Sequence, residues 1–470
     1  MLIALLLSCW GTPTPKPPPD IVLVVIDTLR ADHLGIYGHS RPTSPRMDEL
    51  AREGTWYDRA YAQSGWTLAS FTSLMSGQYP HHHRVGRAPF DSSSFGRLPP
   101  EATTLPEILL GAGYVTAAWV NNTFLAPEFG LNQGFSVYDY QGATNDVNRS
   151  AEDTVDGALA WIATQTEPTF MMVHLMEPHM DYAPPPSTRG RFTADRALTI
   201  EVPYTISGHI GGGHGADVPP AEVQEDIRRV YDEEILAADL AVGRLVDGLK
   251  AAGKWENTTL IITSDHGEEF WDHGGFEHGH TLLGELTRIP LIVSGRGPRK
   301  GQVETVVEHV DLFQAIVKHA GATAPSGTVG EDVFALAESS GKAGGRSALS
   351  ENTLYGPPRL SLVDATHRLE LNLKANSGQV FQVMPDGAEH KLTGPIVMQA
   401  GKRLEAEILA RRGDLRPVEA VAGPKVPSRE VFAELKALGY LDADEPEPTA
   451  PIRLPAAVPE GTEAGPSSGE

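Results

Sequence analysis

Between residues 20 and 345, short runs of β-branched and aliphatic residues alternate with amphipathic stretches. This alternation predicts an α/β fold with a mostly parallel central sheet and helices on both faces, because parallel strands are joined by crossover helices and buried on both sides. The chain is 40% hydrophobic, which is enough for such a core. We expect buried strands at 21–26, 170–175, 260–263 and 291–293, and helices at 44–53, 104–112, 152–164, 221–252 and 310–319.

Beyond residue 345 the pattern changes to alternating polar and apolar residues separated by turn residues. We expect strands at 360–363, 367–373 and 379–384, a hairpin turn at Asn376-Ser377-Gly378 and a helix at 398–411. These elements predict a small antiparallel C-terminal subdomain over residues 346–441, behind a main domain over residues 20–345. The acidic, proline-rich residues 442–470 have no periodic apolar pattern and are predicted to be disordered.

Residues 1–19 combine a short apolar run, the single cysteine of the chain and a Pro-rich stretch. They predict an export signal with a tether, and therefore an extracytoplasmic location in the periplasm or cell envelope. The segment Leu6-Leu7-Ser8-Cys9 resembles the bacterial lipoprotein cleavage box, which implies a lipidated Cys9 as a membrane tether; a plain signal is the alternative. One cysteine also excludes a disulfide framework, a thiolate metal site and a cysteine nucleophile from the folded body.

The charge of the chain excludes one class of partner. It carries 61 acidic and 38 basic residues, a formal net charge of −23. A field of this sign repels phosphate backbones, so we expect no nucleic acid partner.

Candidate metal ligands lie directly after two of the predicted strands. Asp27 follows strand 21–26, and Asp265 and His266 follow strand 260–263. Open α/β sheets bind ligands at the carboxyl ends of their strands, and oxygen plus imidazole ligands suit zinc, manganese or a comparable ion. Taken alone, Asp27 is equally consistent with a helix cap. Three more histidines fall in the fifteen residues that begin at His266, where a solvated loop is the alternative: His273, His278 and His280.

Thr67 is the candidate nucleophile. It lies at the start of a predicted helix, after Ser64-Gly65-Trp66. Unpaired backbone N–H groups and the helix dipole favour an alkoxide and an incoming anion at this place. With a metal near its oxygen, Thr67 could attack an ester; a capping threonine is the alternative.

Together these segments resemble the sulfatase family of the alkaline phosphatase superfamily, over roughly residues 20–390. The motifs are Asp27–Gly35, the turn from Thr67 to Ser76-Gly77-Gln78-Tyr79-Pro80, Glu177-Pro178-His179 with Tyr182, and Thr263–Glu268 continuing to His280 and Arg288-Ile289-Pro290-Leu291. The resemblance implies one divalent ion (Zn, Mn, Mg or Ca) bound by Asp27, Asp265, His266 and the Thr67 oxygen. It also implies that His179 and His280 lie near the substrate's anionic or leaving-group oxygens. A two-metal site is the alternative.

Two departures from the family pattern bear on the chemistry. Family members that use formylglycine carry Cys or Ser in a Cys/Ser-x-Pro-x-Arg segment, whereas this chain has Thr67-Leu68-Ala69-Ser70-Phe71, so we expect no formylglycine. The family's Lys-x-His segment is replaced by Asn121-Asn122-Thr123. An asparagine there resembles superfamily phosphodiesterases and phosphonate hydrolases, which favours phosphorus esters.

The expected function is metal-dependent hydrolysis of a sulfate or phosphate-type ester through a covalent Thr67 intermediate, with a phosphodiester or phosphonate favoured. Asn121 and His179 would orient substrate oxygens, and His280, or His278 in a shifted register, would protonate the leaving oxygen. Arg30 would neutralise charge nearby or form a structural ion pair. The expected substrate is an anionic ester of a small molecule, glycan or lipid headgroup. A true sulfuric-ester hydrolase without formylglycine and a non-catalytic anion- or glycan-binding protein are the alternatives.

Overall fold

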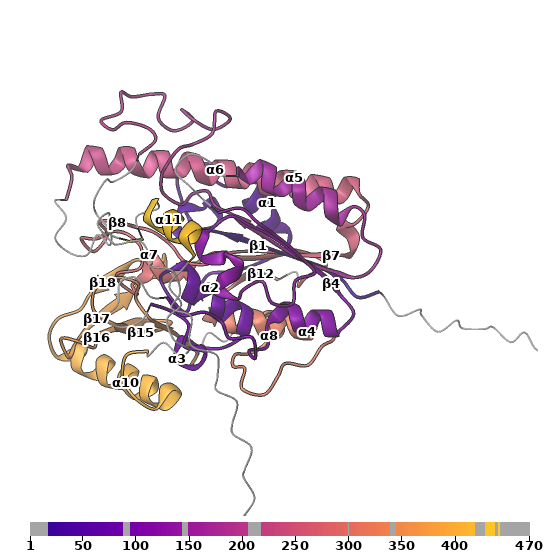
Figure 1. The fold of residues 1–470 in the computed structure, drawn as a ribbon. Coiled ribbons are helices and arrows are strands. Elements are labelled where there is room, and N and C mark those ends of the chain that lie inside the picture. Colours follow the sequence, from indigo (N-terminus) through magenta and orange to yellow (C-terminus); the bar gives the residue numbers. More distant parts are fainter. Residues whose placement is uncertain are drawn as a thin grey trace, which may run out of the picture.

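The structure is a computed structural model of the 470-residue chain. It describes residues 17–87, 95–142, 149–204, 218–298, 300–338, 345–418, 428–437 and 440–441. A central sheet lies between two helical layers, and the C-terminal strands gather at one side with helix α10 (Figure 1). The predictions for Cys9 and for residues 442–470 fall outside the described residues.

The central sheet has eight strands in the order β12-β2-β11-β7-β1-β6-β4-β5. Their bounds are β1 (Asp20–Ile26), β2 (Thr55–Tyr57), β4 (Val115–Val120), β5 (Val137–Tyr140), β6 (Thr169–Leu175), β7 (Thr258–Ser264), β11 (Leu291–Gly295) and β12 (Gly301–Val303). The five strands from β7 to β5 are mutually parallel, whereas β11 runs antiparallel to both of its neighbours. The predicted mostly parallel α/β sheet is therefore confirmed.

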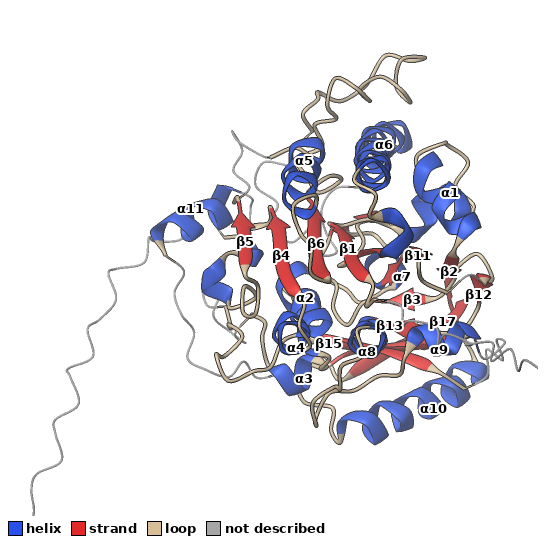
Figure 2. Cartoon of the chain, turned by 90° about the vertical axis from the view of Figure 1, so that its right-hand side faces the viewer, coloured by secondary structure: helices blue, strands red, loops and turns tan. Residues whose placement is uncertain are grey.

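Helices α1 (Pro45–Glu53), α5 (Ala151–Ile162) and α6 (Ala221–Ala251) cover one face of this sheet, and α2 (Thr67–Ser76), α4 (Leu105–Gly111) and α8 (His309–His319) cover the other (Figure 2). The position of β1 explains why residues 21–26 are all apolar. Val22, Val24 and Ile26 join the core under α1, α5 and α6, whereas Ile21, Leu23 and Val25 join the core under α2, α4 and α8. Both faces of the strand are thus buried.

Small elements connect these layers. Strands β3 (Ala60–Tyr61), β10 (Arg288–Ile289) and β13 (Val307–Glu308) form a second sheet, and β8 (Glu269–Phe270) pairs with β9 (Phe276–Glu277). The short helices are η1 (Ala31–His33), η2 (Gly35–Tyr37), α3 (Pro80–His83), η3 (Thr123–Leu125), η4 (Pro127–Phe129), η5 (Trp255–Asn257), α7 (Gly284–Thr287) and α9 (Val333–Glu338).

The C-terminal sheet is antiparallel throughout, with consecutive strands β14 (Ser347–Glu351), β15 (Arg359–Asp364), β16 (His367–Asn372), β17 (Ser377–Val383) and β18 (Glu389–Lys391). Helix α10 (Pro395–Arg412) packs on it through Ala400, Leu404 and Ile408. The predicted turn at 376–378 is displaced: Ser377 and Gly378 already pair with β16, and the turn spans residues 373–376.

Helix α11 (Arg429–Ala437) leaves this subdomain and joins the main domain. Its residues Val431, Phe432 and Leu435 belong to the same apolar core as α2 and α4. Within the described part of the chain, no helix is both long and apolar enough to cross a bilayer.

The packing of α10 gives a stability prediction. Leu404 has 0% of its surface exposed, and Leu409 on the same helix has 41%. We expect Leu404→Ala to lower the free energy of unfolding by about 2–5 kcal/mol, because it removes buried methyl groups and leaves a cavity. Leu409→Ala is the matched control and should cost less than about 1 kcal/mol. Urea denaturation of both variants measures this; equal losses would contradict the packing.

Candidate active site

The candidate metal ligands come together because β1 and β7 are neighbours in the sheet. Ile26 and Ser264 are register partners, so Asp27 and Asp265 leave adjacent strands at the same level. Two hydrogen bonds tie the strand ends: Thr28 N donates to Asp265 Oδ1 (3.2 Å) and Leu29 N donates to Ser264 Oγ (3.0 Å). Thr28 has a φ of 54°, a left-handed conformation that is uncommon for a β-branched residue and is found mostly at functional turns.

Asp27, Asp265 and His266 each place one ligand atom within 4.8 Å of the others, and all three side chains are buried. Asp27 Oδ1 and Asp265 Oδ2 have no hydrogen-bond partner among the described residues. His266 Nδ1 donates to Gly267 O (2.9 Å), so its Nε2 lone pair points into the group, 3.3 Å from Asp265 Oδ2. Two unpartnered carboxylate oxygens and one imidazole nitrogen fit a divalent ion.

The pKa shifts of these three residues also support a bound cation. Burial would raise the pKa of Asp27, but the His174 hydrogen bond and the charges of His179, His174 and His266 hold it below its usual value. Burial and the neighbouring Asp27 charge raise the pKa of Asp265 well above its usual value. Burial lowers the pKa of His266 to about 3, so its ring is neutral and free to act as a ligand. A bound cation would stabilise both carboxylates in the charged form.

Thr67 is the first residue of α2, behind the extended N-cap residue Trp66. Its Oγ1 makes no capping bond and lies 3.3 Å from His266 Nε2, so the alternative of a capping threonine is not realised. The helix ends at Gly77, whose φ of 64° and close approach to the Phe313 ring leave no room for a side chain. The structure therefore brings Thr67 to Asp27, Asp265 and His266, the three candidate metal ligands that we call the metal group.

Of the two neighbouring asparagines, Asn122 enters the group. Its Nδ2 donates to Asp27 Oδ2 (2.7 Å) and lies 3.5 Å from Thr67 Oγ1. The Asn121 side chain instead donates to His174 O (2.6 Å) and accepts from Arg149 Nε (2.8 Å). The structure does not bring Asn121 to Thr67, because successive side chains beyond β4 point in different directions.

His278 lies next to His266, and His179 lies next to His278. The ring centroid of His278 is 4.6 Å from that of His266 and 5.2 Å from that of His179. Gly279 fixes this loop: its N donates to Gly65 O (2.9 Å), just before α2. A side chain at Gly279 would have a φ of 82° and would collide with Leu354, so glycine is required.

Glu268 orients His278. One carboxylate oxygen accepts from His278 Nδ1 (2.9 Å), and the other accepts from the Tyr182 hydroxyl (3.0 Å). This arrangement turns His278 Nε2 toward the site, where it lies 3.4 Å from the Tyr440 hydroxyl. The same hydroxyl is 2.7 Å from His179 Nε2.

His280, expected beside the leaving group, is directed elsewhere. Its Nε2 lies 2.7 Å from Glu269 Oε2, and this contact raises its pKa above the usual value although burial opposes it. His273 pairs in the same way with Glu285 (2.8 Å). Of the histidines in this segment, His266 therefore contacts Thr67, and His278 lies next to His266.

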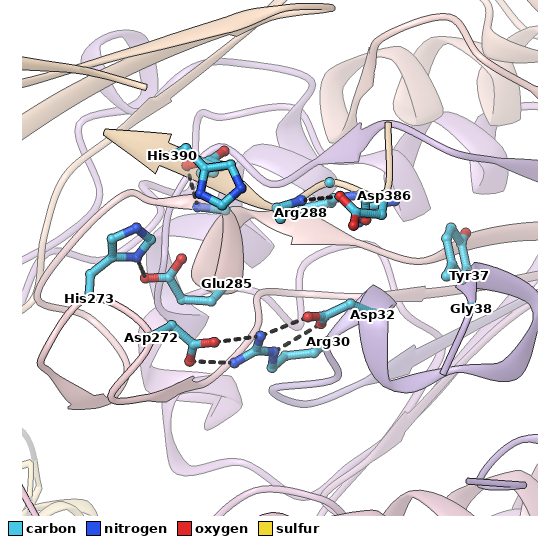
Figure 3. A pocket seen from close by; sticks show the side chains of 14 residues that line it. Arg30, Asp32, Tyr37, Gly38, Asp272, His273, Glu285, Arg288, Asp386 and His390 are labelled. Atoms are coloured by element: carbon cyan, nitrogen blue, oxygen red, sulfur yellow. Dashed lines mark hydrogen bonds and ion pairs between the residues drawn. The ribbon is translucent and has the colours of Figure 1, made fainter. Parts of the chain in front are cut away.

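Arg30 forms a structural ion pair. Its guanidinium donates to Asp32 (2.8 Å), Asp272 (2.8 Å) and the backbone oxygen of Glu268 (3.0 Å). It lines a separate cavity of about 470 Å³ between the main domain and β18, which Figure 3 shows with Arg30 held between Asp32 and Asp272. Of the two roles expected for Arg30, this geometry matches the structural ion pair.

Three site residues lie outside the sequence-based prediction: Asn122, Glu268 and His174. His174 Nε2 donates to Asp27 Oδ2 (3.1 Å) from within β6 and is fully buried. A histidine near the end of an otherwise apolar buried strand is the signal that could have found it. Glu268 carried a weaker signal, since it is an acidic residue two positions after His266.

Comparison with known proteins identifies the family. A model of the sulfatase family matches residues 19–322. The N-acetylglucosamine-6-O-sulfatase of Bacteroides thetaiotaomicron is 23% identical over 428 residues, covering 73% of this chain and 75% of that protein. The chain therefore belongs to the sulfatase family and is a hydrolase that acts on ester bonds.

Solved structures share this fold. BT4656 in complex with its substrate D-glucosamine-2-N,6-O-disulfate superposes with a TM-score of 0.70 at 19% identity, over 86% of this chain and 100% of that one. A phosphonate monoester hydrolase of Agrobacterium radiobacter superposes with a TM-score of 0.69 at 18% identity, over 84% of this chain and 95% of that one.

The metal group gives a second prediction. We expect the purified chain to hold about one divalent ion, and Asp265→Asn to lower this occupancy at least about tenfold, because it removes a charged ligand. Elemental analysis of dialysed protein measures the occupancy.

Asp232→Asn is the matched control. His33, His39 and Asp232 also lie within ligand distance of one another, but the Asp232 carboxylate already accepts hydrogen bonds from both histidines and from the Arg41 cation. We expect the control to keep its metal. If Asp232→Asn lost its metal and Asp265→Asn kept it, the ion would be bound by His33, His39 and Asp232 instead.

Proposed function

We propose that the chain hydrolyses an anionic ester with Thr67 as the nucleophile, and that a phosphodiester or phosphonate monoester is preferred. The observation that carries the proposal is the buried Thr67 Oγ1 at the first turn of α2, 3.3 Å from His266 Nε2 of the metal group. An unmodified hydroxyl at this position supports direct attack without formylglycine. The fold alone does not choose the substrate, because sulfatases and phosphonate hydrolases share it.

The N-terminus of α2 and Asn122 support an oxyanion at residue 67. Backbone N–H groups of a first helical turn have no acceptor within the helix and favour negative charge. Asn122 Nδ2, which contacts Thr67 Oγ1 and Asp27, donates a further hydrogen bond. A divalent ion held by Asp27, Asp265 and His266 would polarise the ester oxygens and favour the deprotonated threonine.

In the proposed reaction, Thr67 Oγ1 releases its proton to water, attacks phosphorus or sulfur in line, and takes a proton back from water when the covalent ester is hydrolysed. The bond to the leaving oxygen breaks, and His278 protonates that oxygen. We assign this role to His278 rather than His280, because Glu268 holds its Nδ1 and turns its Nε2 toward the site. Water then attacks the covalent ester with His278 as the base, which restores Thr67. His179 and Asn122 would orient the non-bridging oxygens.

A sulfate ester is the second candidate substrate. Relatives with the names N-acetylglucosamine-6-O-sulfatase and arylsulfatase A support it, and a neighbour bound to a disulfated glucosamine supports a sugar as the carrier of the ester. Export of the chain, with Cys9 as a lipidated tether, remains a proposal from the sequence of residues 1–19.

The experiment uses the full chain loaded with metal and offers it an aryl sulfate, a phosphate monoester, a phosphate diester and a phosphonate monoester. We expect the diester or phosphonate to react fastest, and Thr67→Ala to lower kcat by about a thousandfold or more, because the nucleophile is lost.

Thr72→Ala is the matched control, since Thr72 lies one turn further along α2, is buried, and donates only to Leu68 O (2.7 Å). It should keep kcat within about threefold of the parent. Activity that survives in Thr67→Ala would show that Thr67 is not the nucleophile. Aryl sulfate as the best substrate would refute the proposed preference for phosphorus esters.

A further inference from the structure

The end of the described chain lies over the candidate active site. We call α11 (Arg429–Ala437) together with Tyr440 and Leu441 the C-terminal cover. Beneath it, Asp27, Asp265 and His266 have no exposed surface, and Thr67 has 1%. Tyr440 itself is only 4% exposed. The reacting groups are therefore closed off from solvent in this structure.

The Tyr440 hydroxyl occupies the hydrogen-bonding positions of both histidines proposed to meet the substrate. His179 Nδ1 donates to Met180 O, so its Nε2 accepts from the Tyr440 hydroxyl at 2.7 Å. The same oxygen lies 3.4 Å from His278 Nε2, whose Nδ1 is held by Glu268. A hydroxyl between these two rings resembles the alcohol that an ester releases. Neither histidine can contact a substrate oxygen while Tyr440 is there.

The cover is held by contacts of α11 as well as by those of Tyr440. Glu434 accepts hydrogen bonds from the Tyr140 hydroxyl (2.7 Å) and from Thr123 Oγ1 (3.2 Å). Ser428 N, just before α11, donates to Glu128 (3.2 Å). The Tyr440 ring packs edge-on against Phe124, with centroids 4.8 Å apart. These polar contacts reach η3, η4 and β5, and the apolar side chains of α11 pack into the core beside α2 and α4. The strand pairings of the central sheet do not involve the cover, so it can separate without breaking that sheet.

We propose that the C-terminal cover is a latch that substrate displaces, with the Tyr440 hydroxyl standing in the place of the leaving-group oxygen. The inference rests on the proposed function of His179 and His278. Substrate binding then includes the cost of breaking the Tyr440 contacts, so the apparent affinity is lower than that of the open site.

Tyr440→Phe tests this in the full chain, because it removes the hydroxyl and keeps the ring against Phe124. We expect KM to fall about fivefold with kcat unchanged. This factor corresponds to the free energy of one hydrogen bond, which substrate no longer has to break in order to bind. Tyr138→Phe is the matched control: its hydroxyl donates to Leu125 O (2.6 Å), outside the site, and its KM should not change. A fall in kcat, or an unchanged KM, would overturn the latch.

A second measurement does not need turnover. In metal-loaded Thr67→Ala, inorganic phosphate or sulfate at saturating concentration should increase hydrogen exchange at the amides of residues 429–437 at least about threefold, because the anion displaces the cover. Unchanged exchange would overturn the latch. Faster exchange in Thr67→Ala, together with a parent chain that hydrolyses none of the four esters, would support the latch and refute the proposed function. Ester turnover with unchanged exchange and unchanged KM would refute the latch alone.

Discussion

Two carboxylates at the ends of neighbouring buried strands are the constraint on which the rest of this site depends. Asp27 and Asp265 follow β1 and β7 and have no surface in contact with solvent. Like charges this close in a dry interior repel each other, so their burial requires compensating positive charge. The hydrogen bond from His174 Nε2 offsets part of this repulsion at Asp27, and the unpartnered carboxylate oxygens leave room for a divalent ion that would supply the positive charge. The start of α2 and the loop of His278 both face this group.

The sequence predicted the sheet and the proximity of Asp27, Asp265 and His266, because both depend on local patterns. The middle of a doubly buried strand is a run of apolar residues, and here a carboxylate comes directly after each strand, Asp27 after β1 and Asp265 after β7. The sequence did not distinguish Asn121 from Asn122 or His280 from His278. Those choices depend on how irregular loops turn, and Glu277 and Gly279 take positive φ values that no periodicity reveals. His174 was hidden inside an apolar strand, and Tyr440 reaches the site from a distant part of the chain.

Several of the residues around the reacting groups act by holding others in place. Glu268 uses both oxygens, one on His278 and one on Tyr182, so the imidazole is fixed in one orientation. Gly279 ties the same loop to Gly65, directly before the helix that carries Thr67. The proposed mechanism needs Thr67 and His278 at a fixed separation, and these contacts favour it.

The central claim is that Thr67 carries the transferred group, and trapping the covalent intermediate tests it most directly. An ester with a good leaving group needs no proton donor in the first step, whereas hydrolysis of the intermediate needs His278 as a base, so His278→Ala should accumulate the intermediate. Peptide mass spectrometry after an acid quench should then find one added group on Thr67: the organophosphoryl group of a diester, the phosphonyl group of a phosphonate or the sulfo group of a sulfate. The same group found on another residue would contradict the account.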